Sequence, residues 1–274
     1  MKTAYEYVIA DVFTATPLTG NQLAVFVDGD AVPDELMQPL AKEIGFSETV
    51  YVRAGDHIRI FTPASELPFA GHPVLGTAFV LAQQRGVDAI ELVTKQSPVS
   101  LAFDPSGRGR MRQPLPTIEP WSGDVDELYA ALGIEGSLCP VDLYYNGVPH
   151  LYVVLDSAGA VAALRPDFSR LGTIAPSEGV NCIAGSGSQW KSRMFGTGLG
   201  MNEDPATGSA AGPLAVHLCR HGLLAWGTEI TITQGVEMGR PSTLYGVAHG
   251  DRDQVTAVEV AGDCVVVGHG VFEL

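Results

Sequence analysis

Two turns, each followed by an apolar segment, carry the side chains of this sequence that are best placed for chemistry. The first contains Gly71 and His72, and the second contains Asp204, Gly208 and Ser209. Small and apolar residues at helical spacing follow each turn, so we expect each turn to open a buried helix. The first N–H groups of a helix and the positive end of its dipole attract a carboxylate. The two turns together predict one site between the two halves of the chain.

A purely structural interpretation of each turn stays open. Either turn alone fits equally well a buried helix whose entry requires glycine, because glycine adopts backbone conformations closed to other residues. Asp204 precedes a helix and is therefore also a candidate N-cap. Ser209 is placed as well for local capping as for hydrogen bonding to a ligand. The presence of an ionisable residue in both turns favours function.

Glu48 is a candidate for proton transfer. It lies where a polar turn meets an apolar strand, between Phe46 and Tyr51. Partial burial there would raise the pKa of its carboxyl group toward the range that suits a general base. A lone glutamate is more often a solvated loop residue, so this interpretation depends on His72 and Asp204 lying in the same site.

Metal and cofactor sites find little support in the sequence. His217 and His221 are four residues apart and would share a helix face, but no carboxylate stands at helical spacing and His217 falls in an apolar stripe. The glycine-rich stretches 185–187 and 196–200 lack the remaining features of a dinucleotide-binding loop. The four cysteines are widely scattered, which predicts buried thiols. We therefore expect no metal and no cofactor.

The composition restricts the partners of the protein. Its 274 residues include 31 acidic and 16 basic side chains, a net charge of −15 that repels nucleic acid and anionic membranes. No apolar run is long enough to cross a bilayer, and the sequence begins without a secretory signal pattern. We expect a soluble cytoplasmic protein that acts on a small molecule.

The pattern of apolar residues predicts an α+β fold. Alternation indicates strands over residues 7–13 and 22–27 and again over 229–233 and 255–260. A helix is expected from residue 34, with Gly45 as its stop. These elements predict mostly antiparallel sheets around a few buried helices.

A proline-rich stretch marks the expected domain boundary. Residues 113–120 include three prolines, which disfavour helix and central strand and suit an extended crossover. The combination of strands and helices that is expected in the first half recurs after this stretch. We expect one domain over residues 1–117 and a similar one over residues 118–274, with return of the last strand to the first domain as an alternative.

Several stretches together resemble the phenazine-biosynthesis PhzF family over nearly the whole chain. The stretches are Asp11–Phe13 with Gly20 and Asn21, Phe46–Thr49, Ile58–Pro63, Glu66–Pro73 and Glu203–Gly212. Two more, Ser192–Phe195 and Gln234–Ser242, resemble the phenazine-pathway members of that family. The resemblance implies a diaminopimelate-epimerase-like fold, in which two similar domains each wrap mostly antiparallel strands around a central helix.

The resemblance also implies an activity. Members of the family isomerise trans-2,3-dihydro-3-hydroxyanthranilate, without a cofactor, to the aminoketone 6-amino-5-oxocyclohex-2-ene-1-carboxylate. Glu48 matches the glutamate that moves a proton from C3 to C1 of the ring. His72 and Asp204 match the pair that orients the substrate. The match implies a homodimer as well.

Further residues are implied as substrate contacts by the same resemblance. Gly71, Gly208 and Ser209 would hold the substrate carboxylate, with Ser47 and Asn21 as additional contacts. Related epimerases carry a cysteine in each turn, and this chain has none there, which disfavours two-thiol epimerisation. Pro205 departs from the alanine expected after the aspartate but leaves the acid in place.

Two alternatives to this activity stay open. One is a PhzF-like isomerase or epimerase of another small amino or hydroxy acid, since the turns indicate proton transfer more firmly than they identify a ring. The other is a non-catalytic binder of an aromatic acid metabolite, which would leave Glu48 without a role.

Overall fold

The computed structural model describes residues 2–197 and 201–274. The last part of the glycine-rich stretch 196–200 therefore lies outside the described residues. Contacts within the chain define two compact units, Met1–Arg112 with Ala261–Leu274 and Gln113–Val260. The expected division of the sequence after residue 117 stays a prediction.

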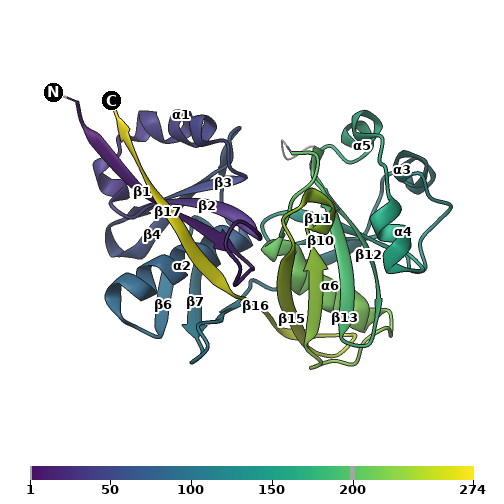
Figure 1. The fold of residues 1–274 in the computed structure, drawn as a ribbon. Helices are drawn as coiled ribbons and strands as arrows, with labels where there is room; N and C mark the ends of the chain where they lie inside the picture. The colour runs from purple at the N-terminus through teal and green to yellow at the C-terminus, as the bar shows by residue number, and fades with distance from the viewer. Residues whose placement is uncertain (1, 198–200) are drawn as a thin grey trace. The chain divides into compact units, whose positions relative to one another are not determined.

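The first unit is a mixed sheet with two helices. Its elements are β1 (Ala4–Val12), β2 (Asn21–Phe26), α1 (Asp34–Ile44), β3 (Glu48–Arg53), β4 (His57–Phe61), β5 (Glu66–Leu67), α2 (Gly71–Arg85), β6 (Ala89–Val93), β7 (Pro98–Phe103), β8 (Gly109–Arg112) and β17 (Cys264–Glu273). β1 pairs antiparallel with both β17 and β2, β2 pairs parallel with β3, and β3 pairs antiparallel with β4. The two ends of the chain thus lie side by side in β1 and β17 (Figure 1).

Helix α2 is buried among β1, β2, β6 and β8 of its own unit (Figure 1). Its first twelve residues, Gly71 to Ala82, are all buried, which is the behaviour expected of a helix that is small and apolar on every side. Gly76 allows the closest approach, because a Cβ atom there would lie 2.6 Å from side-chain atoms of both Leu23 and Val12. The expected buried helix after the first turn is confirmed.

Helix α1 packs against β3 and β4 of the first unit. It begins after Pro33 and ends at Gly45, whose φ of 70° is a left-handed conformation that glycine adopts at no steric cost. Met37 and Leu40 pack with Phe26 and other aromatic residues in a buried cluster. The start and end of this helix follow the sequence pattern.

The second unit repeats the plan of a mixed sheet around a buried helix. Its elements are β9 (Thr117–Pro120), α3 (Val125–Leu132), β10 (Asp142–Tyr145), β11 (Pro149–Val154), α4 (Ala158–Ala163), α5 (Phe168–Ile174), β12 (Gly179–Ser186), β13 (Gln189–Phe195), α6 (Gly208–Arg220), β14 (Ile230–Gln234), β15 (Ser242–Gly250) and β16 (Val255–Gly262). β16 crosses from this unit into the first at its last two residues. Helix α6 contacts β15 and β11, and its residues Gly208 to Cys219 are all buried.

Sheet pairing in the second unit is also mixed. β9, β10 and β11 pair antiparallel in that order, β11 pairs parallel with β12, and β13 pairs parallel with β14. The second half of residues 113–120 forms β9, so the extended conformation expected there belongs to a strand that pairs with β10. An α+β class is confirmed.

None of the described helices has the length and hydropathy needed to span a membrane.

Candidate active site

Glu48 and His72 meet in the interior of the first unit. Glu48 is the first residue of β3, His72 is the second residue of α2, and their side chains are 9% and 4% exposed. The Oε2 atom of Glu48 lies 3.3 Å from the Nε2 atom of His72. Burial lowers the pKa of His72 to about 3, against a smaller opposing effect of the Gln22 backbone. The imidazole is therefore neutral at physiological pH.

Asn21 and Ser47 complete this cluster. Ser47 Oγ donates a 2.7 Å hydrogen bond to Asn21 Oδ1. The amide nitrogen of Asn21 lies 3.3 Å from Nδ1 of His72, so the amide connects the serine to the ring that faces Glu48. Asn21 opens β2, which runs parallel to β3, and this pairing places the beginnings of the two strands beside the first turn of α2. Four residues proposed from the sequence thus lie together.

The second turn is closed by hydrogen bonds that form around Asp204. Thr207 Oγ1 donates to the Asp204 carboxylate at 2.5 Å, and Asp204 is 5% exposed. Gln234, at the end of β14, donates from Nε2 to the Asp204 carbonyl and to Thr207 Oγ1, both at 2.9 Å, and accepts from the Thr207 backbone at 3.3 Å. Asp204 thus does not cap α6; the N-cap is Thr207, and its side chain accepts no capping hydrogen bond.

Ser209 is held by His150, a buried histidine that was not among the residues proposed from the sequence. His150 Nε2 lies 3.0 Å from Ser209 Oγ, and His150 Nδ1 lies 3.4 Å from the amide nitrogen of Asn181. Asn181 donates to the carbonyls of Leu151 and Gly179 at 3.1 and 3.0 Å. Burial lowers the pKa of His150 to about 3, so the ring carries one proton.

This arrangement assigns the position of that proton. The amide nitrogen of Asn181 only donates, so the Nδ1 atom of His150 that faces it carries no hydrogen. The proton is on Nε2, which donates to Ser209 Oγ. The hydroxyl of Ser209 is then left to donate its own hydrogen elsewhere, as a substrate carboxylate would require.

Side chains also bind the first carbonyls of α6. Gln113 donates to the Gly208 carbonyl at 2.8 Å, Asn146 to the Ser209 carbonyl at 2.9 Å, and Tyr152 to the Ala210 carbonyl at 2.6 Å. Pro213 lies inside the helix and has no N–H group for the Ser209 carbonyl. Asn146 supplies that missing donor.

The residues proposed from the sequence therefore form two clusters, each within one unit. The first contains Asn21, Ser47, Glu48 and His72, with Gly71 at the N-terminus of α2; the second contains Asp204, Gly208 and Ser209. Sequence reasoning missed His150, Asn181 and Gln234, which position the second cluster. A polar residue in an otherwise apolar strand, as His150 is, was the available signal.

Comparison with known proteins places the chain in a family. Residues 10–270 match the model of the PhzC-PhzF family, described as phenazine biosynthesis-like proteins. The chain is 46% identical, over 97% of its own length and 98% of the relative's, to a Pseudomonas aeruginosa protein named trans-2,3-dihydro-3-hydroxyanthranilate isomerase.

Solved structures agree with this assignment at the level of the fold. A Bacillus anthracis phenazine biosynthesis protein of the PhzF family superposes with a TM-score of 0.87 at 22% identity, covering 99% of each chain. A hydroxyproline epimerase from Agrobacterium vitis superposes with a TM-score of 0.65 at 11% identity, covering 99% of this chain and 91% of the other. The expected epimerase-like fold is confirmed, and the chain belongs to the PhzC-PhzF family.

Proposed function

We propose that this protein is an isomerase of trans-2,3-dihydro-3-hydroxyanthranilate, which it converts without a cofactor to 6-amino-5-oxocyclohex-2-ene-1-carboxylate. The name and 46% identity of the Pseudomonas aeruginosa relative support the substrate. The observation that carries the chemistry is the buried contact between Glu48 and His72, 3.3 Å apart. A carboxylate held in an apolar interior beside a neutral imidazole suits proton transfer to and from carbon.

In the proposed reaction Glu48 first acts as a base and then as an acid. Its carboxylate takes the proton from C3 of the ring, and the electrons of that C–H bond move through the conjugated diene to C1. Glu48 returns the proton to C1 on the same face. The resulting enol at C3 tautomerises to the ketone, so the product has the same atoms as the substrate.

His72 positions Glu48 and the substrate in this proposal. Because burial keeps the imidazole neutral, the ring does not hold Glu48 as a permanent ion pair across the 3.3 Å contact. Asn21 and Ser47 fix the far side of the ring. Asp204, restrained by Thr207, would accept from the amino or hydroxyl group of the substrate.

Helix N-termini would stabilise the charge that develops during the transfer. Removing the C3 proton places negative charge on the carbon that bears the carboxylate and on the carboxylate itself. N–H groups at Gly71 or Gly208 and the Ser209 hydroxyl are suited to this charge, because fixed donors stabilise it without reorganisation. We propose that these contacts also align C3 of the substrate with Glu48, since correct placement of the reacting atoms contributes to catalysis.

We further propose a cytoplasmic homodimer. The four free cysteines suit a reducing compartment, and the family resemblance favours the assembly. Size-exclusion chromatography with light scattering tests the assembly directly: a mass near twice 28.9 kDa supports it, and a monomer contradicts it.

The activity is tested by incubating the purified protein with trans-2,3-dihydro-3-hydroxyanthranilate, in the presence of EDTA and without any nucleotide. We expect the substrate to disappear and an aminoketone of unchanged mass to form, followed by NMR. Binding without turnover would contradict the proposal and favour a carrier of aromatic acids. Inactivity toward this substrate, with turnover of another small amino or hydroxy acid, would favour a different PhzF-like isomerase.

A further inference from the structure

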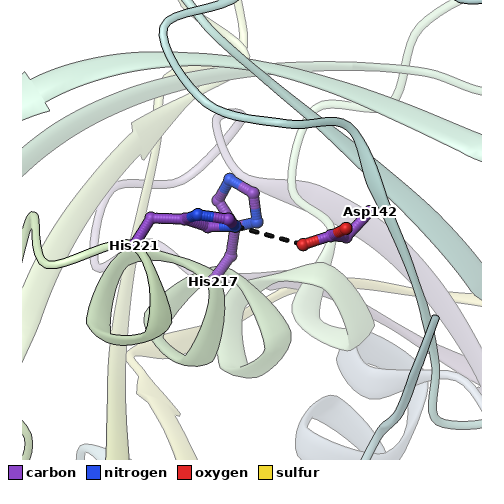
Figure 2. Close-up of side chains that lie close together, drawn as sticks. All are labelled: Asp142, His217 and His221. Atoms are coloured by element: carbon purple, nitrogen blue, oxygen red, sulfur yellow. Dashed lines mark hydrogen bonds and ion pairs between the residues drawn. The ribbon is translucent and has the colours of Figure 1, made fainter. Parts of the chain in front are cut away.

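Three potential metal ligands converge beside the second half of α6. His217 lies in the last turn of α6, His221 follows it as the C-cap residue, and Asp142 reaches both from β10 (Figure 2). One ligand atom from each lies within 4.8 Å of the other two. Oδ2 of Asp142 is 3.1 Å from Nε2 of His221. The carboxylate that the sequence lacked at helical spacing is thus supplied by a strand 75 residues earlier than His217.

We propose that Asp142, His217 and His221 bind a divalent transition-metal ion, and that Zn²⁺ fits the site. Two imidazole nitrogens and one carboxylate oxygen are ligands that Zn²⁺ prefers, and a water molecule would complete four-coordination. Ca²⁺ and Mg²⁺ prefer oxygen ligands throughout, so the two imidazoles disfavour them.

Neighbouring side chains already hold the ligands. The Tyr144 hydroxyl lies 3.1 Å from Nδ1 of His217, and the Tyr152 ring stacks on the His217 ring with centroids 5.2 Å apart. The rings of His217 and His221 have centroids 4.5 Å apart. Partners outside the ligand shell commonly orient ligating histidines in this way.

The cluster is accessible from one side and buried on the other. The side chains of His221 and Asp142 are 20% and 15% exposed, whereas His217 is fully buried. An ion would therefore enter past His221 and Asp142. The Nε2 atom of His217 has no hydrogen-bond partner among the described residues, so this ring has a polar atom that the protein alone leaves unsatisfied.

The charge of Arg220 opposes cation binding. It lies close enough to His217 to act on the ring electrostatically, and it donates to the Arg252 carbonyl at 3.1 Å. The Asp142 carboxylate offsets this charge. Replacing Arg220 by a neutral residue should therefore strengthen binding, an effect opposite in sign to that of removing a ligand.

The proposed ion would have a structural role. Ser209 lies at the start of α6 and His217 eight residues later, a separation of about 12 Å at the rise of an α-helix. The ion would tie β10 to the end of α6 without touching the residues proposed for proton transfer. The inference does not depend on the identity of the substrate.

Zinc titration of protein previously dialysed against EDTA tests the proposal by calorimetry. We expect one Zn²⁺ per chain and a rise in Tm when Zn²⁺ is present, because a ligand that binds the folded state stabilises it. Asp142→Asn and His221→Gln should each weaken Zn²⁺ binding by at least the roughly tenfold that loss of a partner outside the ligand shell already costs, and should abolish the rise in Tm. His57→Gln is the matched control, since His57 is exposed and lies outside the cluster.

Two measurements keep the proposal testable if a ligand variant folds poorly. Arg220→Gln should bind Zn²⁺ more tightly than the wild type. Co²⁺ added to the wild-type protein should develop the stronger visible absorption of a low-coordinate site with nitrogen ligands. Absence of stoichiometric Zn²⁺ binding, or equal binding by wild type and both ligand variants, would overturn the proposal.

Discussion

His150 donates a hydrogen bond from Nε2 to the Oγ atom of Ser209 over 3.0 Å, and both side chains are buried. This bond fixes the serine hydroxyl as an acceptor from one side and leaves its hydrogen available on the other. It makes His150 a positioning residue for the substrate carboxylate in the proposed reaction. Its effect should therefore appear in substrate binding more than in proton transfer.

Replacing His150 by phenylalanine should raise KM with a smaller change in kcat. Loss of a buried hydrogen-bond partner costs about 1–2 kcal/mol, a factor of roughly 5–30 in kcat/KM. His150→Gln keeps a donor and should recover part of the loss. Steady-state kinetics of both variants check this, and a fall confined to kcat would contradict the assigned role.

Replacing Gln234 by alanine should loosen the turn that holds Asp204. The change leaves the Asp204 carbonyl and the Thr207 backbone N–H without the partner they share. Such buried groups cost about 1–3 kcal/mol in the free energy of unfolding, and kcat/KM should fall by roughly tenfold or more because the carboxylate is misplaced. Thr233→Ala, at the exposed neighbouring position of β14, is the control in urea unfolding. Equal stability of the two variants would refute the role of Gln234.

Asn146 and Pro213 should be energetically coupled. Asn146→Leu leaves the Ser209 carbonyl without a donor and should cost about 1–3 kcal/mol. In a Pro213→Ala background the cost should be smaller, because the new backbone N–H at position 213 can reach that carbonyl. A double-mutant cycle by urea unfolding measures the difference, and strictly additive effects would argue against the compensation.

The buried histidines should make stability depend on pH. His72 and His150 have pKa values lowered to about 3 from the ordinary value of 6.5, because burial disfavours the charged ring. Between about pH 3 and pH 6.5, each of these two histidines is therefore protonated in the unfolded chain but neutral in the folded protein. Stability is fully present above about pH 6.5 and falls as the pH drops, by about 1.4 kcal/mol per pH unit for each histidine.

Urea unfolding at several pH values measures this dependence. His150→Gln should reduce the slope near pH 5 by about one proton relative to the wild type. An unaltered slope in His150→Gln would mean that His150 is protonated in the folded protein.

Local sequence patterns were enough to predict α1 and the two helices, α2 and α6, that carry site residues. Pro33 and Gly45 bound α1 as expected, and the small and apolar runs after His72 and before Cys219 form the buried helices α2 and α6. Such features depend on residues close in sequence, which is why spacing alone reveals them.

The residues that position the site contact residues far away in the sequence, and sequence reasoning did not identify them. Gln234 is 27 residues from Thr207, and His150 is 59 residues from Ser209. His150 is marked only as a polar residue in an otherwise apolar strand, and nothing in the local sequence of β11 or β14 shows which distant residue each side chain contacts. The pairing of β9 with β10 joins two segments separated by α3, and the prolines of residues 113–120 indicated only that this segment was neither a helix nor a central strand.

The central claim is that Glu48 moves the proton, and Glu48→Gln tests it most directly. The substitution keeps the size of the side chain and removes the base. Turnover of trans-2,3-dihydro-3-hydroxyanthranilate should fall by at least about a hundredfold, while the circular dichroism spectrum and Tm stay close to those of the wild type. Wild-type turnover by a folded Glu48→Gln protein would contradict the account.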